Sequence, residues 1–92
     1  MEEAREIAVA KSHELRKLPW AELRDRFLDE PEHAEVAGAT GTKYQVETFA
    51  VWDGAKGGDL RVFVAVDDGG WRAFSPLHEC FIVAPDGSFV GE

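Results

Sequence analysis

The spacing of apolar residues changes once along this chain, near Pro31. Before Pro31 apolar side chains recur at the three- and four-residue intervals of an α-helix, and after it they alternate with the two-residue period of a β-strand. Helices followed by strands are typical of an α+β fold. The length of 92 residues suits one domain. The sequence therefore predicts a single α+β domain over residues 1–92, in which two N-terminal helices pack on an antiparallel β-sheet of about four to six strands.

The two helices are predicted over residues 2–17 and 19–29. A residue before proline is driven away from helical geometry, so the first helix should end at Leu18, before Pro19. Pro19 itself suits the first turn of the second helix. Acidic residues lie near the start of the first helix and basic residues near its end, as the helix dipole favours.

The sheet is predicted over residues 34–91. Its expected strands are Ala34–Ala37, Tyr44–Trp52, Leu60–Val66 and Trp71–Ser75, followed by a closing hairpin of Phe81–Ala84 with Ser88–Val90 around Pro85-Asp86-Gly87.

Two turns predict how these strands pair. Asp68-Gly69 favours a two-residue hairpin with a type I′ turn, which would set Val66 opposite Trp71 and Phe63 opposite Phe74. In the longer loop from Asp53 to Asp59, pairing of the two aspartates would set Trp52 opposite Leu60 and Phe49 opposite Phe63.

These registers divide the side chains of the sheet between two faces. The face with the larger apolar set should pack on the helices, and it holds Tyr44, Val46, Ala50, Trp52, Leu60, Val62, Val64, Val66, Trp71 and Ala73. The other face holds Phe49, Phe63 and Phe74 in one row, Glu47, Ala65 and Arg72 in the next row, and Val51 and Arg61 on the far side of the phenylalanines.

Three phenylalanines in a row need a cover, because most apolar stripes are part of a core. One expectation is that the C-terminal segment, with Leu77, Phe81, Ile82 and Phe89, folds over them. A second is an exposed surface for a second copy or another protein. A third is a small-molecule pocket between the sheet and its cover.

The net charge restricts the partners. The chain carries 18 acidic and 10 basic residues, a formal net charge of −8. This sign repels phosphate backbones and anionic membranes, so no nucleic acid and no membrane partner is expected, whereas a basic partner is compatible with it. The charged N-terminal sequence lacks the apolar core of a signal peptide, no apolar run reaches membrane-span length, and there is one cysteine. The expected location is cytoplasmic.

The polar residues do not form a complete catalytic or metal-binding pattern. His78 and Cys80 could share a strand face, but Glu79 between them points the other way. His13 and His33 are isolated, and the Asp53–Asp59 loop and the Asp68-Gly69 turn lie at opposite ends of one strand. The glycines at 54, 57 and 58 lack a phosphate-loop pattern. We therefore expect no metal site, no cofactor and no catalytic residue among them.

From Gly38 onward the chain carries a recognisable series of short motifs. They are Tyr44-Gln45-Val46-Glu47, Trp52-Asp53, Asp67-Asp68-Gly69-Gly70-Trp71-Arg72, Pro76-Leu77, Phe81-Ile82 and the stretch from Pro85 to Glu92, PDGSFVGE. In these motifs the chain resembles a small uncharacterised bacterial family with no known activity. The resemblance implies that the sheet and its closing segment form one unit, and it supplies no catalytic residue, cofactor or partner.

Three functions are compatible with these features. The first is a non-catalytic protein-binding or regulatory module that associates with a second copy, or with another protein, through the sheet face. The second is an acidic inhibitor of the immunity type, which would neutralise a basic target such as a nuclease. The third is a small enzyme with a pocket near Glu47, Arg61 and Arg72. The candidate interaction surface comprises Phe49, Phe63, Phe74, Glu47, Arg61 and Arg72.

Overall fold

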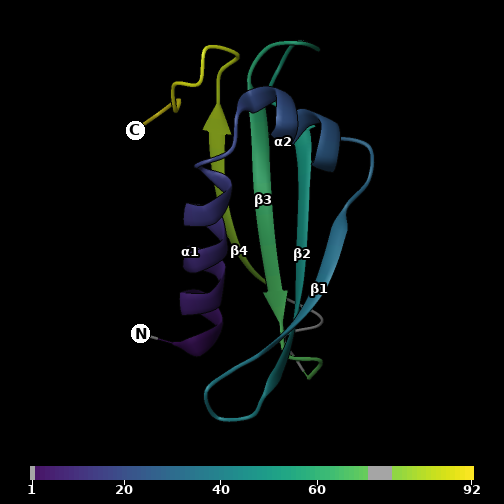
Figure 1. Cartoon of the computed structure of the whole chain (residues 1–92), viewed down its shortest axis with the longest axis vertical. Helices are drawn as coiled ribbons and strands as arrows, with labels where there is room; N and C mark the ends of the chain where they lie inside the picture. Colours follow the sequence, from purple (N-terminus) through teal and green to yellow (C-terminus); the bar gives the residue numbers. More distant parts are fainter. Residues whose placement is uncertain (1, 71–75) are drawn as a thin grey trace.

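The computed structural model of the chain describes residues 2–70 and 76–92, and its elements are two helices followed by four strands. They are α1 (Glu3–Leu15), α2 (Trp20–Phe27), β1 (Glu32–Ala37), β2 (Lys43–Trp52), β3 (Leu60–Asp67) and β4 (Leu77–Val83). The strands form one antiparallel sheet in the order β1-β2-β3-β4, and the helices cover one of its faces (Figure 1). The predicted α+β class is confirmed, with four strands.

Both helices are shorter than the predicted ranges 2–17 and 19–29. The N–H groups of Lys17 and Leu18 donate to the carbonyls of Glu14 and Leu15, so the chain leaves α1 through tighter three-residue turns. Pro19 has an extended ψ of 152° and precedes α2 as its N-cap, instead of occupying the first helical turn.

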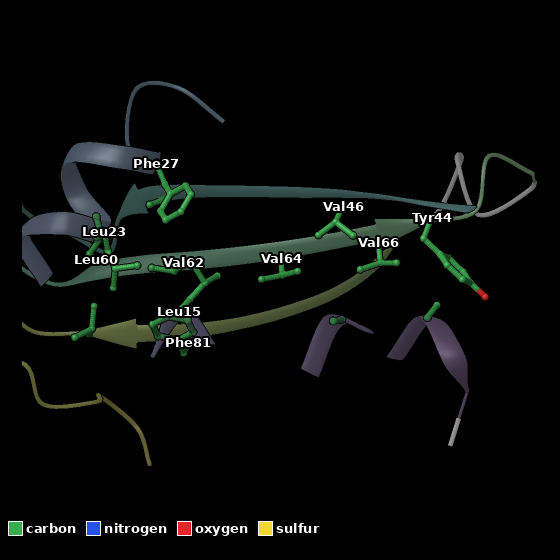
Figure 2. Packing of buried hydrophobic residues seen from close by; sticks show 14 residues of the cluster. Leu15, Leu23, Phe27, Tyr44, Val46, Leu60, Val62, Val64, Val66 and Phe81 are labelled. Carbon is green, nitrogen blue, oxygen red and sulfur yellow. The ribbon is translucent and has the colours of Figure 1, made fainter. Parts of the chain in front are cut away.

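The core lies between the helices and the helix-facing side of the sheet (Figure 2). Alternation along β2 and β3 directs Val46, Val62 and Val64 to this side, where they are buried beside Leu23 and Phe27 of α2. The predicted core face is therefore confirmed for these strands. Trp71 and Ala73, which were predicted on the same face, lie outside the described residues.

The pairing of β2 with β3 follows the predicted register. Trp52 lies opposite Leu60, and Phe49 lies opposite Phe63. The described neighbour on the other edge of β3 is β4, where Leu77 pairs with Val66. The predicted strand Trp71–Ser75 falls outside the described residues. Its expected register on β3 is wrong, because Leu77 lies opposite Val66 and Cys80 lies opposite Phe63 on the edge that this strand was predicted to take. The strand predicted from Phe81 begins earlier, at Leu77.

The predicted type I′ turn at Asp68-Gly69 is wrong. That turn needs a positive φ at both central residues. Gly69 has a φ of +80°, but Asp68 does not have a positive φ. The carboxylates of Asp67 and Asp68 instead accept the N–H groups of Gly69 and Gly70 at 2.9 and 3.0 Å. These side-chain-to-backbone bonds turn the chain without the left-handed aspartate that the prediction required.

One expectation was that the C-terminal segment folds over Phe49 and Phe63, but the segment does not cover them. Phe81 points to the helix side of β4, where it is buried and meets Phe89 edge to face at 5.8 Å. The guanidinium of Arg16, just after α1, stacks on both rings at 5.0 and 4.9 Å. This cation–π cluster holds residues 84–92 beside the end of α1. The predicted turn at 85–87 does form, with Gly87 at a φ of +90° and its N–H donating to Ala84.

The hairpin between β1 and β2 is tied to the first turn of α1 through Glu3. The Glu3 carboxylate accepts hydrogen bonds from the N–H of Ala39 at 2.8 Å and the hydroxyl of Tyr44 at 2.9 Å, and a third from Thr40. Gly38 allows this close approach, because a Cβ on it would lie 2.3 Å from Glu3 Oε1.

Candidate functional site

The second face of the sheet, called here the outer face, carries the side chains that point away from the helices. In the described residues these belong to His33, Glu35 and Ala37 of β1, Lys43, Gln45, Glu47, Phe49 and Val51 of β2, Arg61, Phe63, Ala65 and Asp67 of β3, and His78, Cys80 and Ile82 of β4. The helices pack on the opposite face. The outer face therefore combines an apolar centre with charged side chains on both sides of it.

Phe49 and Phe63 form the centre of the outer face. Their rings are stacked, with centroids 4.9 Å apart and an angle of 13° between the planes. Both side chains are half-buried, whereas their sequence neighbours Thr48 and Val64 are fully buried on the helix side. Cross-strand aromatic pairs stabilise a sheet, and an offset stack of this kind leaves one broad apolar surface toward solvent.

The predicted third member of this row is replaced in the described sheet by another residue. Cys80 of β4 is the partner of Phe63 on the edge opposite Phe49, and Cys80 is exposed. Phe74 and Arg72, which completed the predicted surface, lie outside the described residues. The aromatic row of the described part is therefore a pair, continued by a small thiol side chain.

Two polar contacts flank the phenylalanine pair, one on each side. His33 Nε2 lies 2.9 Å from Glu47 Oε2 across β1 and β2. On the other side, Arg61 donates from Nε and Nη2 to Asp53 Oδ1 at 3.0 and 2.7 Å. The hydrogen bond to Asp53 raises the pKa of Arg61 above its ordinary value. Glu47 and Arg61 are thus on the predicted face, but the aromatic rings separate them and each has another partner.

Two hollows in the described part of the chain are bordered by neither Glu47 nor Arg61. One, of about 240 Å³, lies between α1 and the strands β1 and β2. The other, of about 110 Å³, lies between α1 and β4 and is bordered by His13 and Cys80. A catalytic pair must reach a common substrate within hydrogen-bond distance, and the arrangement of Glu47 and Arg61 does not favour that use.

Sequence reasoning missed the partners of these charges. His33 was expected to be isolated and solvated, and although its side chain is 68% exposed it contacts Glu47. Asp53 was interpreted only as a turn residue. The β1–β2 register, which places His33 opposite Glu47, would have revealed the first pair, but no strong turn signal fixed that register in advance. His78 and Cys80 share the outer face as predicted, and Glu79 points to the helix side, where it pairs with Arg5 at 3.3 Å.

Residues 2–70 and 76–92 contain neither a metal-binding cluster nor a membrane-spanning helix. There, no group of three or more histidine, cysteine or acidic side chains is arranged to hold a metal ion. Neither α1 nor α2 has the length and apolar character that crossing a bilayer requires.

Comparison with known proteins adds no relative. No family model, no curated protein and no solved structure matches the chain. The interpretation of the outer face therefore depends on its own geometry.

Proposed function

We propose that this protein is a non-catalytic protein-binding module and that the outer face of its sheet is the binding surface. The observation that carries the proposal is the stacked pair Phe49–Phe63, half-buried on the face opposite the helices. Aromatic residues near the centre of a surface contribute most to binding when a partner removes them from water. A second copy of the chain is the simplest partner, through an isologous contact of the two faces.

The charged groups around the pair support binding of protein more than catalysis. Arg61 is held by Asp53, and Glu47 is held by His33. Side chains whose charge is already satisfied can form the polar rim of an interface without being left unpaired when water is excluded. An apolar centre with a polar rim is the usual anatomy of a protein interface.

The proposal also holds that the protein does not bind nucleic acid and that it is located in the cytoplasm. The net charge of −8 repels a phosphate backbone. On the outer face the charge of Arg61 is offset by Asp53, and Lys43 lies 3.9 Å from Glu35. Both features support a protein partner. A salt-sensitive complex with RNA or DNA in a mobility assay would contradict this part of the proposal.

The substitution Phe63→Glu tests the outer face. A carboxylate in an isologous contact meets its own copy, so the variant should remain folded and run at monomer size while the wild type runs as a dimer. Analytical ultracentrifugation over a concentration series and thermal melts of both proteins would measure this. Val90→Glu places the same charge on a residue that is 39% exposed in the C-terminal segment, and it should leave the oligomeric state unchanged.

Two results would contradict self-association through this face. One is a wild type that is monomeric at every concentration, with a Phe63→Glu variant that melts at a lower temperature, because the phenylalanine pair would then act only within the chain. The other is an equal loss of dimer in Phe63→Glu and Val90→Glu, because the effect would then follow from net charge alone.

A further inference from the structure

The hydrogen bonding of β1 shows which of its backbone groups face solvent. The N–H of Gly38 donates to the carbonyl of Thr42 across the hairpin. Hydrogen-bonded and non-hydrogen-bonded pairs alternate along an antiparallel ladder, so Val36 and Ala34, which are two and four residues before Gly38, also direct their backbone groups toward β2. The alternate residues His33, Glu35 and Ala37 therefore direct their N–H and C=O groups away from β2. Because β1 is the terminal strand of the described sheet, this row of donors and acceptors lies along an open edge.

An apolar groove runs beside this edge on the helix side. The helix α1 packs mainly on β3 and β4, and it leaves the half of the sheet near β1 less covered (Figure 1). The groove has a volume of about 240 Å³ and is lined by Ile7, Ala10, Lys11, Glu14, Ala34, Val36 and Val46. Ala34 is exposed and Val36 is half-buried although both point toward the helix side. A strand added to β1 would direct every second side chain to the mouth of this groove.

The charges at the edge indicate the kind of strand that fits. Glu35 points to the outer side with its side chain 54% exposed, and Glu14 borders the groove. Glu35 Oε2 accepts a hydrogen bond from Gln45 Nε2 at 3.2 Å, whereas Glu35 Oε1 lies 3.9 Å from Lys43 Nζ, so Oε1 remains able to accept a closer cation. The net charge of −8 adds a long-range attraction for basic chains. A basic side chain directly opposite Glu35 would be stabilised as a cross-strand pair of opposite charge.

We propose that the open edge of β1 accepts an extended segment of a basic partner protein as a fifth strand. In this arrangement the backbone of the segment bonds to His33, Glu35 and Ala37, its apolar side chains enter the groove beside α1, and its alternate lysine or arginine side chains face Glu35. This is strand addition to a sheet edge, in which the main-chain bonds supply affinity and the alternate side chains supply specificity.

A second copy of the chain fits this edge less well than a basic strand. Antiparallel self-pairing centred on Glu35 would set Glu35 against Glu35, which is destabilising. Pairing centred on Ala34 would set His33 against Glu35, but His33 already contacts Glu47 and would gain no new partner.

The proposal concerns a different surface from the outer-face contact, and the two can fail separately. Phe63 lies two strands away from the open edge, across β2. Phe63→Glu should therefore leave strand addition unchanged, and substitutions on the open edge of β1 should leave the self-association of the outer face unchanged.

A labelled synthetic peptide of alternating valine and lysine tests the edge directly. Fluorescence anisotropy should show saturable binding, and an alternating valine–glutamate peptide should bind at least roughly tenfold more weakly because of its charge. Peptides N-methylated on alternate residues supply the decisive control. Methylation of the residues that face β1 should abolish binding, whereas methylation of the other residues should preserve it, because only one set donates to the edge. Equal binding of the two methylated peptides would overturn the proposal.

Variants of the protein locate the site. Glu35→Lys should weaken peptide binding by roughly tenfold or more, while Asp25→Lys, the same charge change on the exposed surface of α2, should have a much smaller effect. Glu35→Pro removes an N–H that faces solvent and leaves the β1–β2 bonds intact, so the variant should fold and lose binding. Equal weakening by Glu35→Lys and Asp25→Lys would show that only net charge attracts the peptide and would also overturn the proposal.

Discussion

The two edges of the sheet are closed to different extents. At β4, the carbonyl of Ile82 accepts the N–H of Val90, and Val83 forms a bridge with Phe89, so the C-terminal segment occupies one end of the edge. Arg16 and Phe81 extend this closure into the core. At β1, every residue from Glu32 to Ala37 is exposed except Val36, which is half-buried.

The difference shows how an acidic chain can keep one edge open without aggregating. Natural sheets protect free edges with short strands and charged side chains. β1 has six residues and carries Glu32, His33 and Glu35, so it repels another copy of itself while leaving its backbone groups accessible. The β4 edge is instead protected by packing. We therefore expect the stability of the fold to be concentrated at β4 and α1, and β1 to open more readily.

Removal of a core side chain at the closed edge should have the largest effect on stability. Phe81 is 3% exposed and contacts Phe89 and Arg16, so Phe81→Ala should lower the free energy of unfolding by about 3–5 kcal/mol. Val36→Ala at the open edge removes less apolar area from a half-buried site, and it should lower the same free energy by about 1 kcal/mol. Urea denaturation followed by circular dichroism would measure both. Similar losses for the two variants would contradict the contrast between the edges.

The sequence predicted the parts of the fold that depend on local periodicity. The helix-to-strand change near Pro31 and the alternation along β3 were sufficient for the α+β class and the core face. The register of Phe49 with Phe63 followed from pairing Asp53 with Asp59, and the N–H of Asp53 does donate to the carbonyl of Asp59 at 2.8 Å. The sequence left open what covers the phenylalanine row, and the position of residues 84–92 depends on the contact of Arg16 with Phe81 and Phe89. That contact joins residues more than sixty positions apart, and neither periodicity nor turn chemistry carries a signal for it.

The same limit applies to the candidate site. Alternation correctly placed Glu47 and Arg61 on the face that carries Phe49 and Phe63. The partners of these charges, and the open edge with its groove, depend on the β1–β2 register and on the position of α1 over β3 and β4. These are properties of packing between distant segments, which a single sequence does not encode in a local pattern.

The contact from α1 to the β1–β2 hairpin should make the open edge sensitive to acid. The hydrogen bond from Tyr44 is the main cause that lowers the pKa of Glu3 below its ordinary value of 4.5, and bonds from Ala39 and Thr40 act in the same direction. Because the folded pKa is depressed, this contribution to stability is fully present above pH 4.5 and is lost as the pH falls through the folded value. Denaturation midpoints of wild type and Glu3→Gln between neutral pH and pH 3 would measure it.

Glu3→Gln should be less stable than wild type at neutral pH, and the difference should shrink below pH 4.5 as the wild-type carboxyl becomes protonated. Asp86 provides a matched control, because bonds from Ser88 also lower its pKa but it lies in the C-terminal turn. Hydrogen exchange of β1 amides should respond to Glu3→Gln and not to Asp86→Asn. An acid response of β1 that is the same in both variants would contradict the role of Glu3.

The smallest effect is expected from the contact between His33 of β1 and Glu47 of β2. His33 and Glu47 are 68% and 40% exposed, and ion pairs in water contribute little because solvent screens them and both side chains lose freedom. A double-mutant cycle of His33→Ala and Glu47→Ala should give a coupling of no more than about 0.5 kcal/mol at neutral pH. A coupling well above that value would mean that this pair fastens β1 to β2, and β1 would then be held by side-chain contacts as β4 is. The two edges would then not differ in how firmly they are held. The outward-facing backbone groups of β1 would still be open, because they follow from its register with β2.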